Sequence, residues 1–207
     1  MGCLGGKNKE KIDENSQIRM SKTVEEKQKE KLYEIKIVLL GDPAVGKSSL
    51  VQRFCSDKFE EKYKTTIGGA YLQKEVKLKN GHILKLHIWD TGGQEKFRSM
   101  ADLYYKDAVA AILVYDVSNP ETLDSLEYWI KELNEKVGEN IIISIAGNKC
   151  DLPPEQKKIH HNQGKNFCKE NDVTIFNETS AKTGFGVKEL FTALAHKVYD
   201  IQKNEGK

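Results

Sequence analysis

One glycine-rich segment constrains this chain more than any other feature. Residues 41–48 read GDPAVGKS, which matches the pattern G-x-x-x-x-G-K-[ST]. An apolar run at 35–40 precedes the segment and helical spacing over 47–54 follows it, which is the context that the motif requires. Backbone N–H groups of such a loop, at the N-terminus of a helix, can bind phosphate oxygens. The segment therefore predicts a phosphate site within a strand–loop–helix unit.

Two side chains of this loop carry the expected chemistry. Lys47 is placed to reach the β- and γ-phosphates of a nucleotide, and the Ser48 hydroxyl is placed to bind Mg²⁺. A glycine-rich turn with a chance lysine is the alternative, and the flanking strand and helix argue against it. The nucleotide-binding residues expected in this segment are Gly41, Asp42, Ala44, Val45, Gly46, Lys47, Ser48 and Ser49.

Strands and helices alternate along the rest of the chain. The dipeptide Asn80-Gly81 is a strong hairpin signal and predicts strands at 71–80 and 82–89. Further strands are expected at 109–115, 141–146 and 173–176, and helices from Asn119-Pro120 to Leu133, over 155–171 and over 187–201. This alternation predicts an α/β fold with a mostly parallel sheet, helices on both faces and ligands at the carboxyl ends of the strands.

A second motif, DTGGQ at residues 90–94, follows the second hairpin strand. Asp90 can hold Mg²⁺ through water, Gly93 can offer its N–H to a γ-phosphate, and Gln94 can orient an attacking water. Together with Lys47, Gln94 and Gly93 are therefore the candidate catalytic residues, and Asp90 joins the candidate magnesium site. A tight Gly-Gly turn with exposed polar residues is the alternative.

A third motif, NKCD at residues 148–151, follows another expected strand. The Asp151 carboxylate can accept hydrogen bonds from guanine N1–H and N2–H₂. Adenine has no such donor pair, so this residue predicts selection of guanine, with Asn148 and Lys149 as the other candidate binding residues. A polar loop is the alternative. The segment ETSAK at 178–182 follows the next expected strand and is a modest signal alone.

Composition excludes several classes of protein. The 207 residues carry a formal net charge of +2 at pH 7, which argues against a nucleic-acid binder driven by positive charge. No apolar run is long enough for a transmembrane helix. The cysteines are too widely spaced for a disulfide framework and include no CxxC pair, which favours a reducing compartment; they are Cys3, Cys55, Cys150 and Cys168.

Composition also divides the chain. Residues 1–31 are mostly Lys, Glu, Asn, Gln and Ser, which bury too little apolar surface to fold alone. We therefore expect a disordered arm at 1–31, a folded domain at 32–203 and a short tail at 204–207. We expect a monomer that binds no nucleic acid.

In their order and spacing the four motifs resemble those of the Ras-like small GTPases, over residues 33–203. The resemblance is sharper to the Rab family. TIGGAY at 66–71 is similar to the Rab switch I segment, WD at 89–90 with FRS at 97–99 is similar to switch II, and LYYKDA at 103–108 is similar to the Rab tyrosine-tyrosine segment. The resemblance implies a P-loop GTPase fold with a six-stranded sheet. It also implies a GTP/GDP switch that hydrolyses GTP and regulates endosomal vesicle trafficking.

The family resemblance assigns further roles. It implies that Thr66 completes the magnesium site with Ser48 and Asp90 when GTP is bound, and that Phe59 packs against the guanine ring. The other nucleotide-binding residues that it implies are Ser180, Ala181 and Lys182. The implied effector-binding residues are Ile67, Gly68, Tyr71, Trp89, Phe97 and Tyr104. The implied partners are a Vps9-type exchange factor, a TBC-type GTPase-activating protein and effectors of the GTP-bound form.

The two ends of the chain bear on membrane attachment. No cysteine follows Cys168, so the sequence offers no acceptor for C-terminal prenylation. Gly2 is a candidate for myristoylation and Cys3 for palmitoylation, and two such signals suffice for stable anchoring. Gly6 stands where the myristoylation pattern has Ser or Thr. The combination resembles the N-acylated, non-prenylated endosomal Rabs of plants and protists, and implies the cytoplasmic face of endosomal membranes with a cytosolic pool.

Two departures from the Rab pattern leave alternatives open. Gly92 stands where Rab proteins usually have Ala, and a double glycine here is also typical of the N-myristoylated Arf proteins. Pro43 removes one N–H donor from the phosphate loop. The alternatives are therefore an Arf-like GTPase and a nucleotide-bound binding module with little hydrolysis. An ATP-using P-loop kinase is disfavoured by the NKCD motif.

Overall fold

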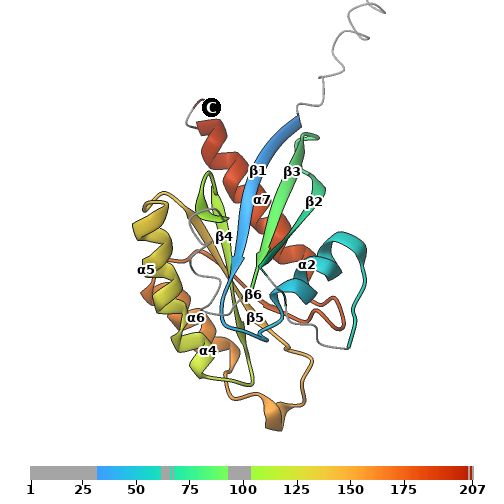
Figure 1. The fold of residues 1–207 in the computed structure, drawn as a ribbon, viewed down its shortest axis with the longest axis vertical. Helices are drawn as coiled ribbons and strands as arrows, with labels where there is room; N and C mark the ends of the chain where they lie inside the picture. Colours follow the sequence, from blue (N-terminus) through green and yellow to red (C-terminus); the bar gives the residue numbers. More distant parts are fainter. Residues whose placement is uncertain (1–31, 62–65, 67, 93–103, 205, 207) are drawn as a thin grey trace, which may run out of the picture. The chain divides into compact units, whose positions relative to one another are not determined.

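A computed structural model describes residues 32–61, 66, 68–92, 104–204 and 206 of the chain (Figure 1). In this part a six-stranded sheet has the order β2-β3-β1-β4-β5-β6. Its strands are β1 (Leu32–Leu40), β2 (Gly69–Lys77), β3 (Ile83–Thr91), β4 (Ala110–Asp116), β5 (Ile142–Asn148) and β6 (Ile175–Thr179). Some of the residues singled out from the sequence lie outside the described part, namely Gly2, Cys3, Ile67, Gly93, Gln94 and Phe97.

The pairing confirms the predicted α/β fold with a mostly parallel sheet. β2 runs antiparallel to β3, whereas the other neighbouring strands pair in parallel. The hairpin between β2 and β3 contains Asn80-Gly81, but β2 ends at Lys77 and β3 begins only at Ile83, so neither strand reaches the dipeptide. The reason is that the Leu78 N–H donates to the His82 carbonyl at 2.8 Å and the Asn80 side chain accepts from the His82 N–H at 3.1 Å, which closes a longer loop.

Helices cover both faces of the sheet. They are α2 (Lys47–Ser56), α4 (Glu121–Asp124), α5 (Leu126–Lys136), α6 (His161–Glu170) and α7 (Val187–Asn204), with a 3₁₀ turn at Pro154–Gln156. The helix expected from Asn119-Pro120 is interrupted at Ser125, which divides it into α4 and α5. The Asn119 side chain accepts a hydrogen bond from the Glu121 N–H at 3.3 Å, which is the capping contact expected at this end.

Two other expected boundaries were wrong. The helix expected over 155–171 does not form at 157–160, because the N–H groups of Lys158 and Ile159 both donate to the Val117 carbonyl at 2.9 Å. The strand expected at 173–176 begins at Ile175 and continues to Thr179. Val173 does not join it, because its N–H donates to the Cys168 carbonyl at the end of α6 at 2.8 Å.

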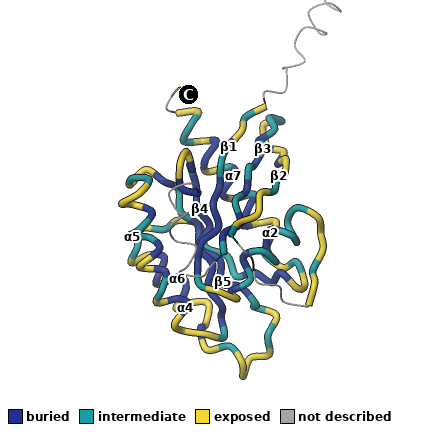
Figure 2. Tube along the Cα trace, in the orientation of Figure 1, coloured by how far each residue is buried: buried dark blue, intermediate teal, exposed yellow. Residues whose placement is uncertain are grey.

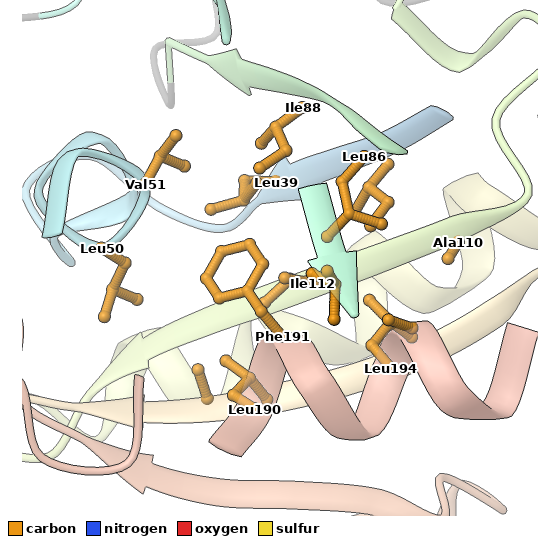
Figure 3. Packing of buried hydrophobic residues seen from close by; sticks show 14 of the residues in the cluster. Leu39, Leu50, Val51, Leu86, Ile88, Ala110, Ile112, Leu190, Phe191 and Leu194 are labelled. Carbon is orange, nitrogen blue, oxygen red and sulfur yellow. The ribbon is translucent and has the colours of Figure 1, made fainter. Parts of the chain in front are cut away.

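The core has two layers, one on each face of the sheet. Alternate residues of β1 point to opposite layers, so Ile37 packs with α2 and α7 whereas Val38 packs with α5 and α6. β4 is buried along its whole length between the layers (Figure 2). Figure 3 shows the α2–α7 layer, in which the labelled residues of the two helices are Leu50, Val51, Leu190, Phe191 and Leu194. None of the helices in the described residues is both long and apolar enough to cross a bilayer.

This topology places the sequence motifs along one edge of the sheet. The carboxyl ends of the parallel strands lie at the same edge, and each is followed by a loop that can carry ligand contacts. β1 leads into the phosphate loop, β3 ends beside Asp90, β5 ends at Asn148 and β6 ends at Thr179.

Candidate functional site

The phosphate loop is held in shape by backbone geometry and by one buried lysine. Gly46 adopts φ +100°, and a Cβ there would lie 2.3 Å from Asn148 Nδ2, so both conformation and space require glycine. The Lys47 Nζ donates to the carbonyls of Gly41 and Asp42, at 2.6 and 2.8 Å. Burial lowers the pKa of Lys47 to about 8, against the opposing effect of the carboxylates of Asp90 and Asp42. A buried ammonium at this helix N-terminus is suited to a phosphate partner.

Three oxygen-bearing side chains converge next to this lysine. The hydroxyls of Ser48 and Thr66 lie 2.7 Å apart, although Thr66 is 18 residues further along the chain. Asp90 is 2% exposed, and within the described residues its Oδ1 has no hydrogen-bond partner. Burial raises the pKa of the Asp90 carboxyl, whereas the Ser48 hydroxyl and Lys47 lower it. Two hydroxyls and a buried carboxylate are hard oxygen ligands, so the residues present fit Mg²⁺.

Asn148 joins three loops of the site. Its Nδ2 donates to the Val45 carbonyl in the phosphate loop at 2.8 Å. Its Oδ1 accepts from the Thr179 hydroxyl and from the Ala181 N–H, both at 3.3 Å. Asn148 is 1% exposed, so these bonds are shielded from water. The side chain therefore connects the phosphate loop to the end of β6 and to the loop that follows it.

Two carboxylates follow the central strands, and only one is open to solvent. Asp151 is exposed, and its Oδ1 accepts a hydrogen bond from the Ser180 hydroxyl at 2.6 Å. Ser180 in turn accepts from the Thr183 N–H at 3.0 Å, which fixes the hydroxyl. Asp116, at the end of β4, forms an ion pair with Lys149 at 2.5 Å. The oriented Asp151 carboxylate is thus the group that can accept paired N–H donors from a base.

The remaining candidates occupy varied environments. Ser49 lies on α2, Lys182 is exposed, and Phe59 is partly buried against the α2–α7 layer of the core. Burial raises the pKa of the Cys150 thiol, which opposes thiolate formation beside Asp151.

A row of aromatic rings lies beside the site, over β2, β3 and the segment before β4. The ring centroids of Tyr71 and Trp89 are 5.5 Å apart, and those of Trp89 and Tyr104 are 5.9 Å apart. Tyr71 is 49% exposed and Tyr104 is buried. The Lys36 Nζ lies 4.7 Å from the centre of the Trp89 ring. The Tyr71 hydroxyl is hydrogen-bonded to His87 Nδ1, which holds the exposed ring in place.

Three residues that contribute to the candidate site were not selected from the sequence. Asp116 could have been found from its position at the carboxyl end of a strand. Thr91, whose hydroxyl donates to the Leu39 carbonyl at 2.6 Å, lies inside a selected motif without having been selected. Arg53, whose guanidinium donates to Ala181 and Lys182, has no sequence signal, because a single arginine on a helix does not indicate its partner.

The fold and these loops define a P-loop nucleotide-binding protein. Residues 36–200 match the Ras family, and the chain belongs to this family. It is 45% identical to "Ras-related protein Rab-5B" of Plasmodium falciparum, over 96% of this chain and 94% of the relative. It is 45% identical to "GTP-binding protein ypt5" of Schizosaccharomyces pombe, over 79% of this chain and 77% of the relative. It is 41% identical to "Ras-related protein Rab-22A" of Homo sapiens, over 84% and 88%.

These comparisons confirm the predicted Rab-like GTPase, an enzyme that hydrolyses GTP. The relatives carry Rab and Ypt names, so the Arf-like alternative is not favoured, nor is the P-loop kinase.

Proposed function

We propose that the loops at the carboxyl edge of the sheet bind GTP with Mg²⁺ and hydrolyse it to GDP. The observation that carries the proposal is the set of oxygen ligands around Asp90, with a buried lysine beside it. Ser48, Thr66 and Asp90 would hold Mg²⁺, and Lys47 with the phosphate-loop N–H groups would bind the β- and γ-phosphates. Asp151, oriented by Ser180, would accept the guanine donors.

Hydrolysis transfers the γ-phosphoryl group to water, with GDP as the leaving group. When bound, Mg²⁺ neutralises charge that develops on the phosphates. Lys47 carries positive charge to the same oxygens from a position fixed by the carbonyls of Gly41 and Asp42. Gln94 would orient the attacking water and Gly93 would donate its N–H to the γ-phosphate. The intrinsic reaction is expected to be slow until a TBC-type activating protein supplies an arginine.

Substitution of Gln94 with leucine tests this assignment. Leucine has a similar size but cannot bind water, so single-turnover GTP hydrolysis should slow greatly while GTP binding is retained. The measurement is phosphate release from preloaded protein, with GTP affinity determined on the same sample. An unchanged hydrolysis rate would remove Gln94 from the mechanism.

We further propose that GTP binding orders an effector-binding face. Thr66 and Gly93 would contact Mg²⁺ and the γ-phosphate, and hydrolysis would release both segments. Figure 1 shows β2 and β3, which carry Tyr71 and Trp89, beside the helix α2 that begins at the phosphate loop. The face would comprise Ile67, Gly68, Tyr71, Trp89, Phe97 and Tyr104. A Vps9-type exchange factor would reload the site.

We propose that this GTPase acts in vesicle trafficking at the cytoplasmic face of endosomal membranes, with a cytosolic pool. The support is the similarity to proteins named Rab-5B and Rab-22A. The match to Rab-5B covers 96% of the chain and so extends into the N-terminal arm, where Gly2 and Cys3 would be acylated. Intact mass spectrometry of membrane and soluble fractions from native cells tests this. Myristate and palmitate on the membrane form would support it, and an unmodified, soluble chain would contradict it.

A further inference from the structure

Arg53 of helix α2 connects the helix of the phosphate loop to the loop that follows β6. Its Nε donates to the Ala181 carbonyl at 2.9 Å, and its Nη2 donates to the Lys182 carbonyl at 2.7 Å. The arginine side chain is 17% exposed; its bond to Ala181 is partly buried, whereas its bond to Lys182 is open to water. The two acceptors are 128 and 129 residues away in sequence, which makes this a long-range tertiary contact.

The geometry of the guanidinium explains why arginine suits this position. Its planar group donates from Nε and Nη2 to two successive carbonyls of the loop. The remaining nitrogen, Nη1, donates to the carbonyl and the Oδ1 of Asp57, at 3.0 and 2.9 Å, at the end of the same helix. The Asp57 side chain is 92% exposed, so that ion pair orients the arginine but adds little stability.

The loop after β6, which Arg53 contacts, also supports the side chain proposed to recognise the base. Asn148 holds the N–H of Ala181, and Arg53 holds its carbonyl, so this peptide segment is fixed from two sides. Ser180, the preceding residue, orients the Asp151 carboxylate at 2.6 Å. A displacement of the Ala181 backbone would therefore move the hydroxyl that positions Asp151.

We propose that Arg53 is a positioning residue that fixes the guanine-binding loop relative to the phosphate loop. The inference rests on the proposed nucleotide-binding site. Helix α2 carries Lys47 and Ser48 in its first turn and Arg53 further along, so one rigid element locates both the phosphates and the base. Arg53 thereby slows nucleotide release and sharpens the preference for guanine over hypoxanthine. Guanine offers Asp151 both N1–H and N2–H₂, whereas hypoxanthine offers N1–H alone and depends less on the exact position of the carboxylate.

The test compares release of GDP and IDP, in the presence of Mg²⁺, from the full chain and from the variant Arg53→Lys. Lysine keeps the charge and the helix propensity but cannot donate to two carbonyls from a planar group. The expected result is GDP release faster by about tenfold, as two lost hydrogen bonds would give, with IDP release changed less. The preference for GDP over IDP should therefore fall several-fold, by roughly the difference between the two rate changes.

Two further variants distinguish a positioning role of Arg53 from a general destabilisation of the nucleotide site. Asp57→Ala removes the exposed partner but leaves the loop contacts, and both release rates should stay within about twofold of wild type. Arg53→Gln leaves one amide NH₂ group as the side-chain donor, so the preference of this variant for GDP over IDP should also fall. Equal acceleration of GDP and IDP release, or unchanged release in both Arg53 variants, would overturn the inference. A wild-type chain that binds neither nucleotide would instead contradict the proposed function, and the inference with it.

Discussion

Substitution of Asn148 with alanine should lower the free energy of unfolding by about 3 kcal/mol, at roughly 1 kcal/mol for each of its three buried side-chain hydrogen bonds. The substitution removes the donor to Val45 and the acceptor of Thr179 and Ala181. The three partner groups lie where water has little access, because Asn148 is 1% exposed. For a domain of this size the loss corresponds to a melting temperature lower by about 6–12 °C.

Equilibrium unfolding in urea measures this change, and the exposed Asn134 on α5 offers a matched control. Asn134→Ala should change the free energy of unfolding by no more than about 0.5 kcal/mol. Each curve should be recorded at two GDP concentrations, because weaker nucleotide binding adds its own loss of apparent stability. If Asn148→Ala lowers the free energy of unfolding by less than about 1 kcal/mol after that correction, the idea that this side chain joins the three loops is refuted.

Three further predictions concern single residues. Burial raises the pKa of Cys168 to about 11, so its thiolate forms only as the pH rises toward that value. An alkylating reagent at pH 8 should therefore modify Cys168 only after the chain unfolds. Rapid labelling of this thiol in the folded protein would contradict the prediction. Gly186 has φ +68° and a Cβ there would lie 2.1 Å from a β6 carbonyl oxygen, so Gly186→Ala should destabilise the fold by about 2 kcal/mol or more in thermal unfolding, whereas an unchanged melting temperature would refute the strain. His87 should be the Nε2–H tautomer when neutral, because the Glu34 carboxylate at 3.1 Å can only accept and the Tyr71 hydroxyl can donate to Nδ1; imidazole ¹⁵N shifts at pH 8 that showed Nδ1–H would be inconsistent with it.

The parallel core of the fold could be predicted from the sequence because its strands are continuous apolar runs. β4 and the second half of β1, residues 37–40, are buried on both faces, so their residues need no polar alternation and stand out between glycine and polar segments. The order in which strands, motifs and helices follow one another in the sequence then allows few arrangements of the strands in a parallel sheet. The hairpin at Asn80-Gly81 was also predictable, since its signal is local.

The boundaries that were wrong depend on partners far away in sequence. Residues 157–160 have helical composition, yet Lys158 and Ile159 donate to Val117, which lies on another loop. Likewise β6 extends through polar residues to Thr179 because β5 offers a paired backbone there. Local propensity cannot show that a neighbouring backbone will take these hydrogen bonds.

The residues of the candidate site likewise fall into those that the sequence predicts and those that depend on the folded structure. Residues whose chemistry is local to a motif, such as Lys47 and Asp151, could be selected from the sequence. Thr66 came only from family resemblance, and the structure places its hydroxyl 2.7 Å from that of Ser48. Arg53 could not be found, because its role depends on which loop happens to lie beside α2 in the folded chain.

In the proposed function, these loops together form one site for a guanine nucleotide with Mg²⁺. The most direct test is competition of GDP and ADP for the wild-type chain, measured with Mg²⁺ and again with a chelator. We expect GDP to bind about 10⁴-fold more tightly than ADP, because adenine leaves Asp151 unpaired, and we expect the chelator to speed GDP release. Similar affinities for GDP and ADP, or GDP release that is indifferent to Mg²⁺, would contradict it.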